Sequence, residues 1–210
     1  MKSPDALMSD IDKLYEETLE NFKSNRSGRV RRQVRNVLDL IGLSSRETIL
    51  EVGVATGKFT SMMTRANRVF ALDVSIENLK RAEKAVKGMG DISSLRCIAA
   101  DCRAIPFADL LFDKIVAIDI IEHLKDAVFD IFCAEAYRVL KPGGQICLYT
   151  PNLLHPYEFA RPFRPVMRME HVGVRTRASI CRSLKGHNFI VEKSHFNNLF
   201  RRISVKAKKG

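Results

Sequence analysis

The stretch "ILEVGVATGKFT", from Ile49 to Thr60, decides the fold of this chain. Its first residues are apolar enough for a strand that is covered on both faces, as the strands of parallel sheets are. The strand ends in an acid, Glu51, and the small residues Gly53, Ala55 and Gly57 follow at alternate positions. An acid beside a tight loop at the end of a strand indicates a ligand site. A triphosphate, a dinucleotide and a sulfonium nucleoside are the candidate ligands.

Two of these three ligands fit the loop poorly. A phosphate-binding P-loop requires G-x-x-x-x-G-K-[ST], whereas Lys58 here leads into Phe59. A dinucleotide loop requires G-x-G-x-x-G, and Glu51 would be an unfavourable neighbour for a pyrophosphate. A cationic ligand tolerates the acid, and S-adenosylmethionine carries both a sulfonium and an ammonium group.

The rest of the chain alternates between strand and helix patterns. Apolar positions at helical spacing predict two N-terminal helices, over 11–22 and over 30–41, the second ending at Gly42. Further helices are expected after an N-cap at Ser75 and around 128–139. Pro142 and Gly143 predict a turn. The expected strands of this part cover 48–53, 68–75, 94–101, 112–119 and 145–150. An irregular stretch with four prolines follows. After it we expect a helix over 176–186 and strands near 189–196 and 199–207. Such alternation implies a parallel sheet with helices on both faces.

Composition limits the class of protein. A chain of 210 residues with 46% hydrophobic and 28% charged residues is typical of one globular domain. The five cysteines form no CxxC pair, and neither a secretion signal nor a membrane-spanning run is present in the sequence. We therefore expect a single cytoplasmic domain that does not contact the membrane.

The net charge of +11 is concentrated in three places: residues 22–35, residues 161–185 and the C-terminal tail. One interpretation is an anionic partner, such as RNA or a phosphorylated or carboxylated metabolite. The other interpretation is a solvated basic surface that keeps the protein soluble. Both remain open from charge alone.

Four expected strands end in or beside an acid, at Glu51, Asp73, Asp101 and Asp119. With "LEVGVATG", "ALDVS", "AADCRAIPFADLLFDKIVAIDIIEHL" and "RVLKPGGQICLYTPN" in this order, residues 46–152 resemble the class I, Rossmann-like S-adenosylmethionine-dependent methyltransferases. The resemblance implies an α/β fold with a mostly parallel seven-stranded sheet, helices on both faces and an antiparallel last strand. It also implies S-adenosylmethionine as cofactor, with Asp73 accepting from the ribose hydroxyls and Asp101 and Cys102 flanking the adenine. The residues implied to bind it are Glu51, Gly53, Val54, Ala55, Gly57, Asp73, Val74, Asp101, Cys102, Asp119 and Tyr15. Ala55 departs from the glycine that is usual there, and Cys102 has an alternative interpretation as a core residue.

The resemblance further implies an arrangement of the single domain, residues 1–210. Residues 1–45 would form a helical lid, 46–151 the cofactor-binding core, 152–175 a loop on the substrate side, and 176–210 a closing helix and strands. Both the helix around Tyr15 and segment 152–175 are expected to close over the cleft, because they carry apolar residues but lie outside the sheet.

A cluster of candidate catalytic residues follows the fourth strand. Asp119, Glu122 and His123 lie in "DIIEHL", and His171 follows much later. The arrangement resembles that of metal-using O-methyltransferases of quinone biosynthesis and of small RNA, which implies a divalent metal such as Mg²⁺ on these four residues. Asp119 is one methylene shorter than the glutamate usual there. A general base at His123 or His171, or no direct role for the cluster, are the alternatives.

The methyl acceptor is the least determined part of this prediction. The sequence lacks an Asn/Asp-Pro-Pro-aromatic motif for exocyclic amines and a Pro-Cys for covalent attack on pyrimidines. We expect O-methylation of a small or medium-sized metabolite, and an anionic metabolite is one interpretation of the basic charge. The alternatives are an RNA methyltransferase that uses the basic surface, although aromatic residues for base stacking are few, and a non-catalytic cofactor-binding protein.

Overall fold

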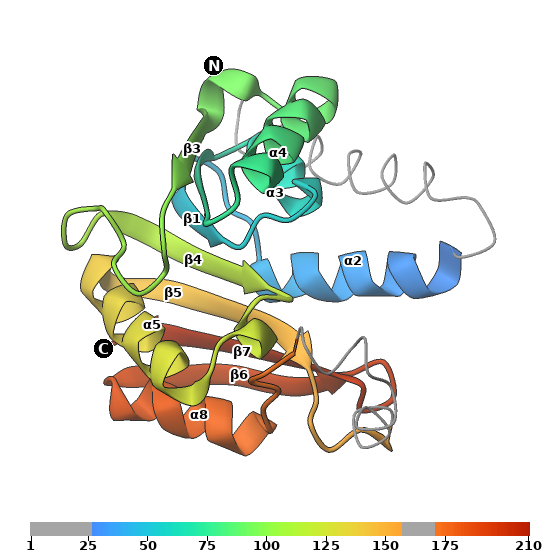
Figure 1. The fold of residues 1–210 in the computed structure, drawn as a ribbon, viewed down its shortest axis with the longest axis vertical. Helices are drawn as coiled ribbons and strands as arrows, with labels where there is room; N and C mark the ends of the chain where they lie inside the picture. Colours follow the sequence, from blue (N-terminus) through green and yellow to red (C-terminus); the bar gives the residue numbers. More distant parts are fainter. Residues whose placement is uncertain (1–26, 157–170) are drawn as a thin grey trace.

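A computed structural model describes residues 27–156 and 171–210, which form a seven-stranded sheet with helices on both faces (Figure 1). The order of its strands is β3-β2-β1-β4-β5-β7-β6. Strands β1 to β5 run parallel, and β7 is antiparallel to both of its neighbours. The strands are β1 (Thr48–Val52), β2 (Arg68–Asp73), β3 (Leu95–Ala99), β4 (Phe112–Ile118), β5 (Leu140–Pro151), β6 (Phe189–Asn197) and β7 (Arg202–Lys209). The predicted fold class is confirmed.

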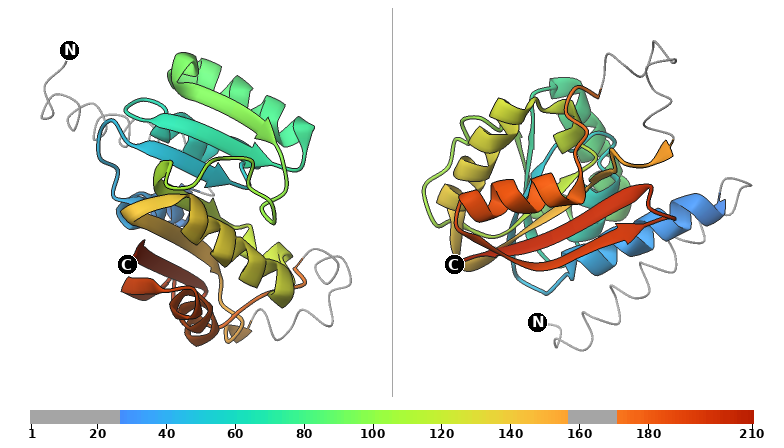
Figure 2. Two further views of the ribbon diagram at one scale, coloured as in Figure 1. Left: turned by 90° about the vertical axis from the view of Figure 1, so that its left-hand side faces the viewer. Right: turned by 90° about the horizontal axis from the view of Figure 1, so that it is seen from below.

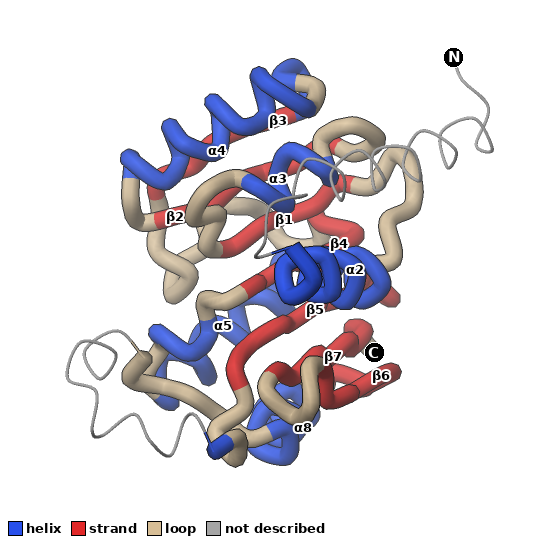
Figure 3. The backbone as a smooth tube through the Cα atoms, turned by 90° about the vertical axis from the view of Figure 1, so that its right-hand side faces the viewer, coloured by secondary structure: helices blue, strands red, loops and turns tan. Residues whose placement is uncertain are grey.

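The helices divide between the two faces of this sheet. One face carries α2 (Ser27–Ile41), α3 (Lys58–Met63) and α4 (Ile76–Met89), and α2 is seen nearly end-on in Figure 3. The other face carries α5 (Asp126–Val139) and α8 (Arg177–Gly186). Figure 2 (right) shows α8 and α2 on opposite sides of β6 and β7. Two short 3₁₀ turns, η1 (Ile92–Ser94) and η2 (Ile121–His123), complete the elements.

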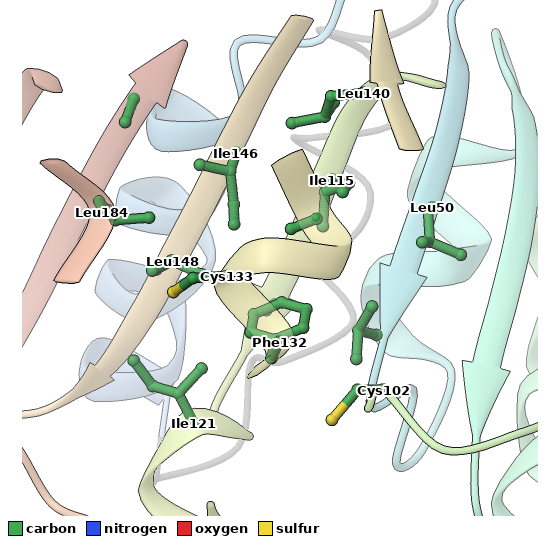
Figure 4. Close-up of a cluster of buried hydrophobic side chains, with 14 of the residues drawn as sticks. Leu50, Cys102, Ile115, Ile121, Phe132, Cys133, Leu140, Ile146, Leu148 and Leu184 are labelled. Carbon is green, nitrogen blue, oxygen red and sulfur yellow. The ribbon is translucent and has the colours of Figure 1, made fainter. Parts of the chain in front are cut away.

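Alternate residues of each central strand enter the two separate cores. Leu50 and Ile115 point towards α5 and α8, where Phe132 fills the centre of the cluster in Figure 4. Their neighbours Ile49 and Val116 point to the opposite side, towards α2, α3 and α4. Burial on both faces explains why these strands read as continuous apolar runs.

Several local predictions are confirmed, but the turn predicted at Pro142 and Gly143 lies within β5, and the predicted starts of β5 and β7 are wrong. The Ser75 side chain accepts a hydrogen bond from the Asn78 amide, as an N-cap does, and α2 ends before Gly42, whose φ is 56°. However, β5 begins at Leu140, five residues before the predicted start. Gly143 has the expected positive φ of 73°, but it forms part of an irregularity within β5, between the pairs Phe112–Leu140 and Lys114–Gln145.

The turn between β6 and β7 lies at the edge of the sheet where the parallel strands have their carboxyl ends. Because β7 is antiparallel to β5, its first residues pair with the carboxyl end of β5, with Arg202 opposite Pro151. Three successive residues of this turn, Asn198, Leu199 and Phe200, have positive φ angles of 53°, 53° and 65°. This conformation is unusual for residues with a side chain.

Two expectations concern residues that the structure does not describe. The first predicted helix, with Tyr15, lies outside the described residues, as does most of the segment expected to close over the cleft. Within residues 27–156 and 171–210, no helix has the length and hydropathy needed to cross a membrane.

Candidate active site

Neighbouring residues shape the loop after β1, because they leave no room for a side chain at Gly53 or at Gly57. A Cβ atom on Gly57 would lie 2.3 Å from the Cα of Ala82 in α4, and one on Gly53 would lie 2.8 Å from Ile120. Both glycines also have positive φ angles, of 71° and 76°. Ala55 has a φ of 45° and so adopts the left-handed conformation that explains the usual glycine at this position. Contacts with α4 and with the end of β4 therefore fix the course of the loop.

Asp73, at the end of β2, connects this loop to α4. Its carboxylate accepts hydrogen bonds from the backbone amides of Val54 at 3.0 Å and Ser75 at 2.9 Å. The side chain of Asn78 also donates to it, at 3.3 Å. The carboxylate that is expected to bind the ribose is thus already oriented by three donors.

Glu51 lies below the same loop and is almost completely buried. Its carboxyl group is hydrogen-bonded to the hydroxyl of Thr60. Burial, reinforced by the negative charge of Asp73, raises the pKa of Glu51 to about 8 although the Thr60 hydrogen bond opposes the shift. The side chain is therefore mostly protonated at neutral pH in the absence of a cationic ligand.

The predicted adenine side is less uniform. Val74 leaves 72% of its side chain exposed directly after β2, as an apolar surface for a ring would. Asp101 forms a bidentate ion pair with Arg103, and the hydrogen bonds from the Arg103 side chain lower the pKa of Asp101. Cys102 is buried in the core between the sheet and α5, so its side chain belongs to the packing. The strand-end carboxylates, the tight loop with its two glycines and the exposed Val74 together fit a nucleoside with a cationic tail.

Asp119 follows β4 at the centre of this edge and has a φ of 52°. Its carboxylate accepts hydrogen bonds from Gln33 of α2, at 3.0 Å, and from Arg202 of β7. Burial raises the pKa of Asp119, and the positive charge of Arg202 counteracts this shift. Asp119 thus connects α2, β4 and β7. Sequence patterns did not indicate either of its partners.

Glu122, His123 and His171 come together beside Asp119. One potential ligand atom from each of the three lies within 4.8 Å of the others. The rings of the two histidines meet edge to face, with centroids 4.9 Å apart. Glu122 is buried and accepts a hydrogen bond from Thr150 at 3.0 Å, and burial together with the charge of Asp119 raises its pKa to about 7. Asp119 is not a member of this cluster.

Arg175 fixes the segment that brings His171 to this place. It is buried, and its guanidinium donates to the backbone carbonyls of Ile121 and Leu124, around η2, and of Gly173. It also pairs with Asp126 and lies 4.3 Å from the ring of Phe129. Arg175 belongs to the basic range 161–185 of the sequence, and no local pattern distinguishes a buried arginine from an exposed one.

Comparisons with known proteins agree with this geometry. Residues 50–148 match the family model described as a methyltransferase domain. A ubiquinone/menaquinone biosynthesis C-methyltransferase of Klebsiella pneumoniae is 27% identical over 132 residues, which cover 61% of this chain and 49% of the relative. The chain spans about half the length of the curated relatives it matches.

Solved structures show the same fold at low sequence identity. Geranyl diphosphate C-methyltransferase from Streptomyces coelicolor, in complex with Mg²⁺, geranyl diphosphate and S-adenosyl-L-homocysteine, has a TM-score of 0.73 at 13% identity, covering 93% of this chain and 85% of that one. The [4+2]-cyclase SpnF has a TM-score of 0.74 at 14% identity, covering 96% and 93%. At these identities the likeness concerns the fold alone.

The sheet order and the acids at the strand ends define a Rossmann-like, class I methyltransferase fold. The part of the chain that carries the glycine loop and most of these acids, residues 50–148, is thus similar to the methyltransferase domain family.

Proposed function

We propose that this chain transfers a methyl group from S-adenosylmethionine to a small-molecule acceptor, and that His123 or His171 takes the proton that the acceptor loses. The observation that carries the proposal is the contact between the two histidine rings, 4.9 Å apart, at the carboxyl end of β4. In open α/β sheets, ligands bind beyond the carboxyl ends of the strands.

The residues around the glycine loop would hold the cofactor. Asp73 would accept from the ribose hydroxyls, Val74 would cover the adenine, and Glu51 and Asp119 would face the cationic end. When bound, the cofactor supplies an electrophilic methyl group on a sulfonium. Much of the rate enhancement then comes from holding the acceptor atom in line at attack distance.

The histidine pair defines what kind of acceptor the site favours. A hydroxyl oxygen, which the sequence analysis favoured, becomes a stronger nucleophile when a base removes its proton. An acidic carbon also must lose a proton, and the curated relatives are named C-methyltransferases. We therefore propose an acceptor that loses a proton from the methylated atom, whether that atom is oxygen or carbon.

A divalent metal on Glu122, His123 and His171 is the second candidate for activating the acceptor. Two imidazoles and one carboxylate, with positions left open, suit Zn²⁺, Mn²⁺ or Fe²⁺ better than Mg²⁺, which prefers oxygen ligands. The three ligand atoms lie within 4.8 Å of one another, close to the separation of about 4 Å that two metal–ligand bonds of about 2.1 Å permit. The metal would lower the pKa of a hydroxyl bound to it.

The first experiment measures cofactor and acceptor classes separately. Calorimetry should show binding of S-adenosylhomocysteine and no binding of NAD or ATP. Transfer of label from the methyl-labelled cofactor is then measured with a panel of small phenols and enolisable carbonyl compounds, and with tRNA. Labelled tRNA without any labelled small molecule would contradict the proposal.

The second experiment separates the base from the metal. One of the two variants His123→Gln and His171→Gln, the one that removes the base, should lower kcat by about 10²–10⁴-fold and change the pH–rate profile. His195→Gln, on β6, is the matched control that should leave both unchanged. Loss of activity on chelation, with metal found by elemental analysis in the wild type but not in His171→Gln, would favour the metal over the general base.

A further inference from the structure

A cavity lies at the same edge of the sheet as the proposed active site, and no residue of the glycine loop lines it. Its volume is about 400 Å³, and its lining comes from the start of α2, from the segment after β5 and from the turn between β6 and β7 (Figure 2, right). The lining residues are Gly28, Arg32, Gln33, His155, Asn198, Leu199, Arg201 and Arg202. This volume lies within the range of small-molecule sites.

The charge of this cavity is one-sided. Three arginines and one histidine line it, and none of the described lining residues is acidic. The nearby acid, Asp119, is bound to Arg202 and therefore offsets one of these positive charges. Guanidinium groups that converge on one cavity match the geometry of phosphate and carboxylate groups.

One apolar lining residue, and two apolar residues that adjoin lining residues in the chain, are exposed. Leu199, which lines it, is 88% exposed, and the adjacent Phe200 is 62% exposed. Leu154, next to the lining residue His155, is 58% exposed. Exposed apolar groups beside a cationic pocket suit a ligand that has an anionic group attached to an apolar body.

Two lining residues connect the cavity to the proposed active site. Gln33 and Arg202 both donate to the carboxylate of Asp119, which borders the Glu122–His123–His171 cluster. No residue of the glycine loop and neither Asp73 nor Asp101 lines the cavity. The cavity therefore lies on the side of Asp119 that is away from the proposed cofactor site.

We propose that this cavity binds the anionic group of the methyl acceptor, and that the acceptor is a small molecule with a phosphate or carboxylate on an apolar body. The inference rests on the proposed function and adds a substrate class to it. Arg32 and Arg201 bind the anion, while the apolar rim at Leu199 and Phe200 covers the body of the molecule.

The test uses simple probes and calorimetry on the full chain. Hexyl phosphate and heptanoate represent the two anion chemistries, and hexanol is the neutral control. We expect one or both anions to bind, with or without S-adenosylhomocysteine, and hexanol to bind at least tenfold more weakly. Arg32→Gln and Arg201→Gln should each weaken anion binding by about tenfold. Lys84→Gln, an exposed cation on α4, should leave it unchanged.

Three outcomes would overturn this inference while leaving methyl transfer intact. Equal binding of hexanol and the anions would show an apolar site without charge recognition. Displacement of hexyl phosphate by S-adenosylhomocysteine would assign the arginines to the cofactor carboxylate. Binding of tRNA that is lost in the Arg32 and Arg201 variants, without binding of the small anions, would assign them to nucleic acid. Failure of S-adenosylhomocysteine to bind at all is a separate result, and it contradicts the proposed function.

Discussion

The carboxylate of Asp73 accepts a hydrogen bond from the amide of Val54, 3.0 Å away, and so joins the end of β2 to the loop that follows β1. This contact orders the loop before any ligand binds. A residue that shapes the loop and also contacts the ligand has a double effect when it is replaced.

We expect Asp73→Ala to weaken binding of S-adenosylhomocysteine by about 1.5–3 kcal/mol, the cost of losing hydrogen bonds to a charged acceptor. Calorimetry measures this change. Glu77→Ala, which removes an exposed carboxylate from the first turn of α4, is the matched control. Equal affinity for Asp73→Ala and wild type would show that this carboxylate does not contact the ribose.

Alanine variants of two glycines with the same backbone conformation distinguish the cost of a strained backbone from the cost of a steric clash. Gly57 and Gly143 have φ angles of 71° and 73°, but a Cβ would meet α4 at Gly57 and nothing within 4 Å at Gly143. Both alanine variants lose about 1 kcal/mol of stability through the left-handed backbone. Gly57→Ala should lose a further 1–3 kcal/mol, because α4 must shift. Urea denaturation measures both, and equal losses would contradict the tight contact between Gly57 and Ala82.

The buried Glu51 predicts a decrease in stability as the pH rises. Its pKa is about 8 in the folded chain, against an ordinary value of 4.5, so the folded state favours the protonated form. This contribution is complete below about pH 4.5 and is lost as the pH rises through about 8. The free energy of unfolding should fall by on the order of 4 kcal/mol between pH 5 and pH 9 through this group.

Glu51→Gln should remove the part of the pH dependence that comes from Glu51, because the amide does not ionise, while the part that comes from Glu122 remains. The exposed Glu83→Gln is the control that keeps both parts. Urea denaturation of both variants and wild type at pH 5, 7 and 9 provides the comparison. A wild-type pH dependence that persists undiminished in Glu51→Gln would assign it to other groups, of which Glu122 is the first candidate.

Arg175 is expected to position His171 without touching the acceptor. Arg175→Met leaves the carbonyls of Ile121 and Leu124 without their donor and should destabilise the chain by about 2–4 kcal/mol. Below the unfolding transition, kcat should fall while KM for the cofactor stays unchanged. Arg182→Met, on the exposed side of α8, is the control. A rise in the KM for the cofactor would instead show that the glycine loop is disturbed.

Local patterns predicted the features that depend on neighbouring residues. Ser75 as an N-cap, Gly42 as a helix end and the alternation of strands and helices all follow from short-range chemistry. Interactions between distant segments could not be predicted in this way. Arg202 reaches Asp119 only because β7 pairs with β5, and Arg175 is buried only because its segment returns to η2. The start of β5 at Leu140 likewise depends on pairing with Phe112 across the sheet.

Asp119 lies between the proposed donor site and the proposed acceptor cavity, and this separation has a consequence for how such a chain evolves. Apart from Asp119, the residues proposed for the donor lie on β1, β2 and the loops beside them, whereas those proposed for the anionic group of the acceptor lie on α2 and at the turn between β6 and β7. The turn can therefore be lengthened, shortened or exchanged for that of another protein without altering the donor half. On the proposed function, transplanting residues 198–201 should change the compound that is methylated and keep the same donor.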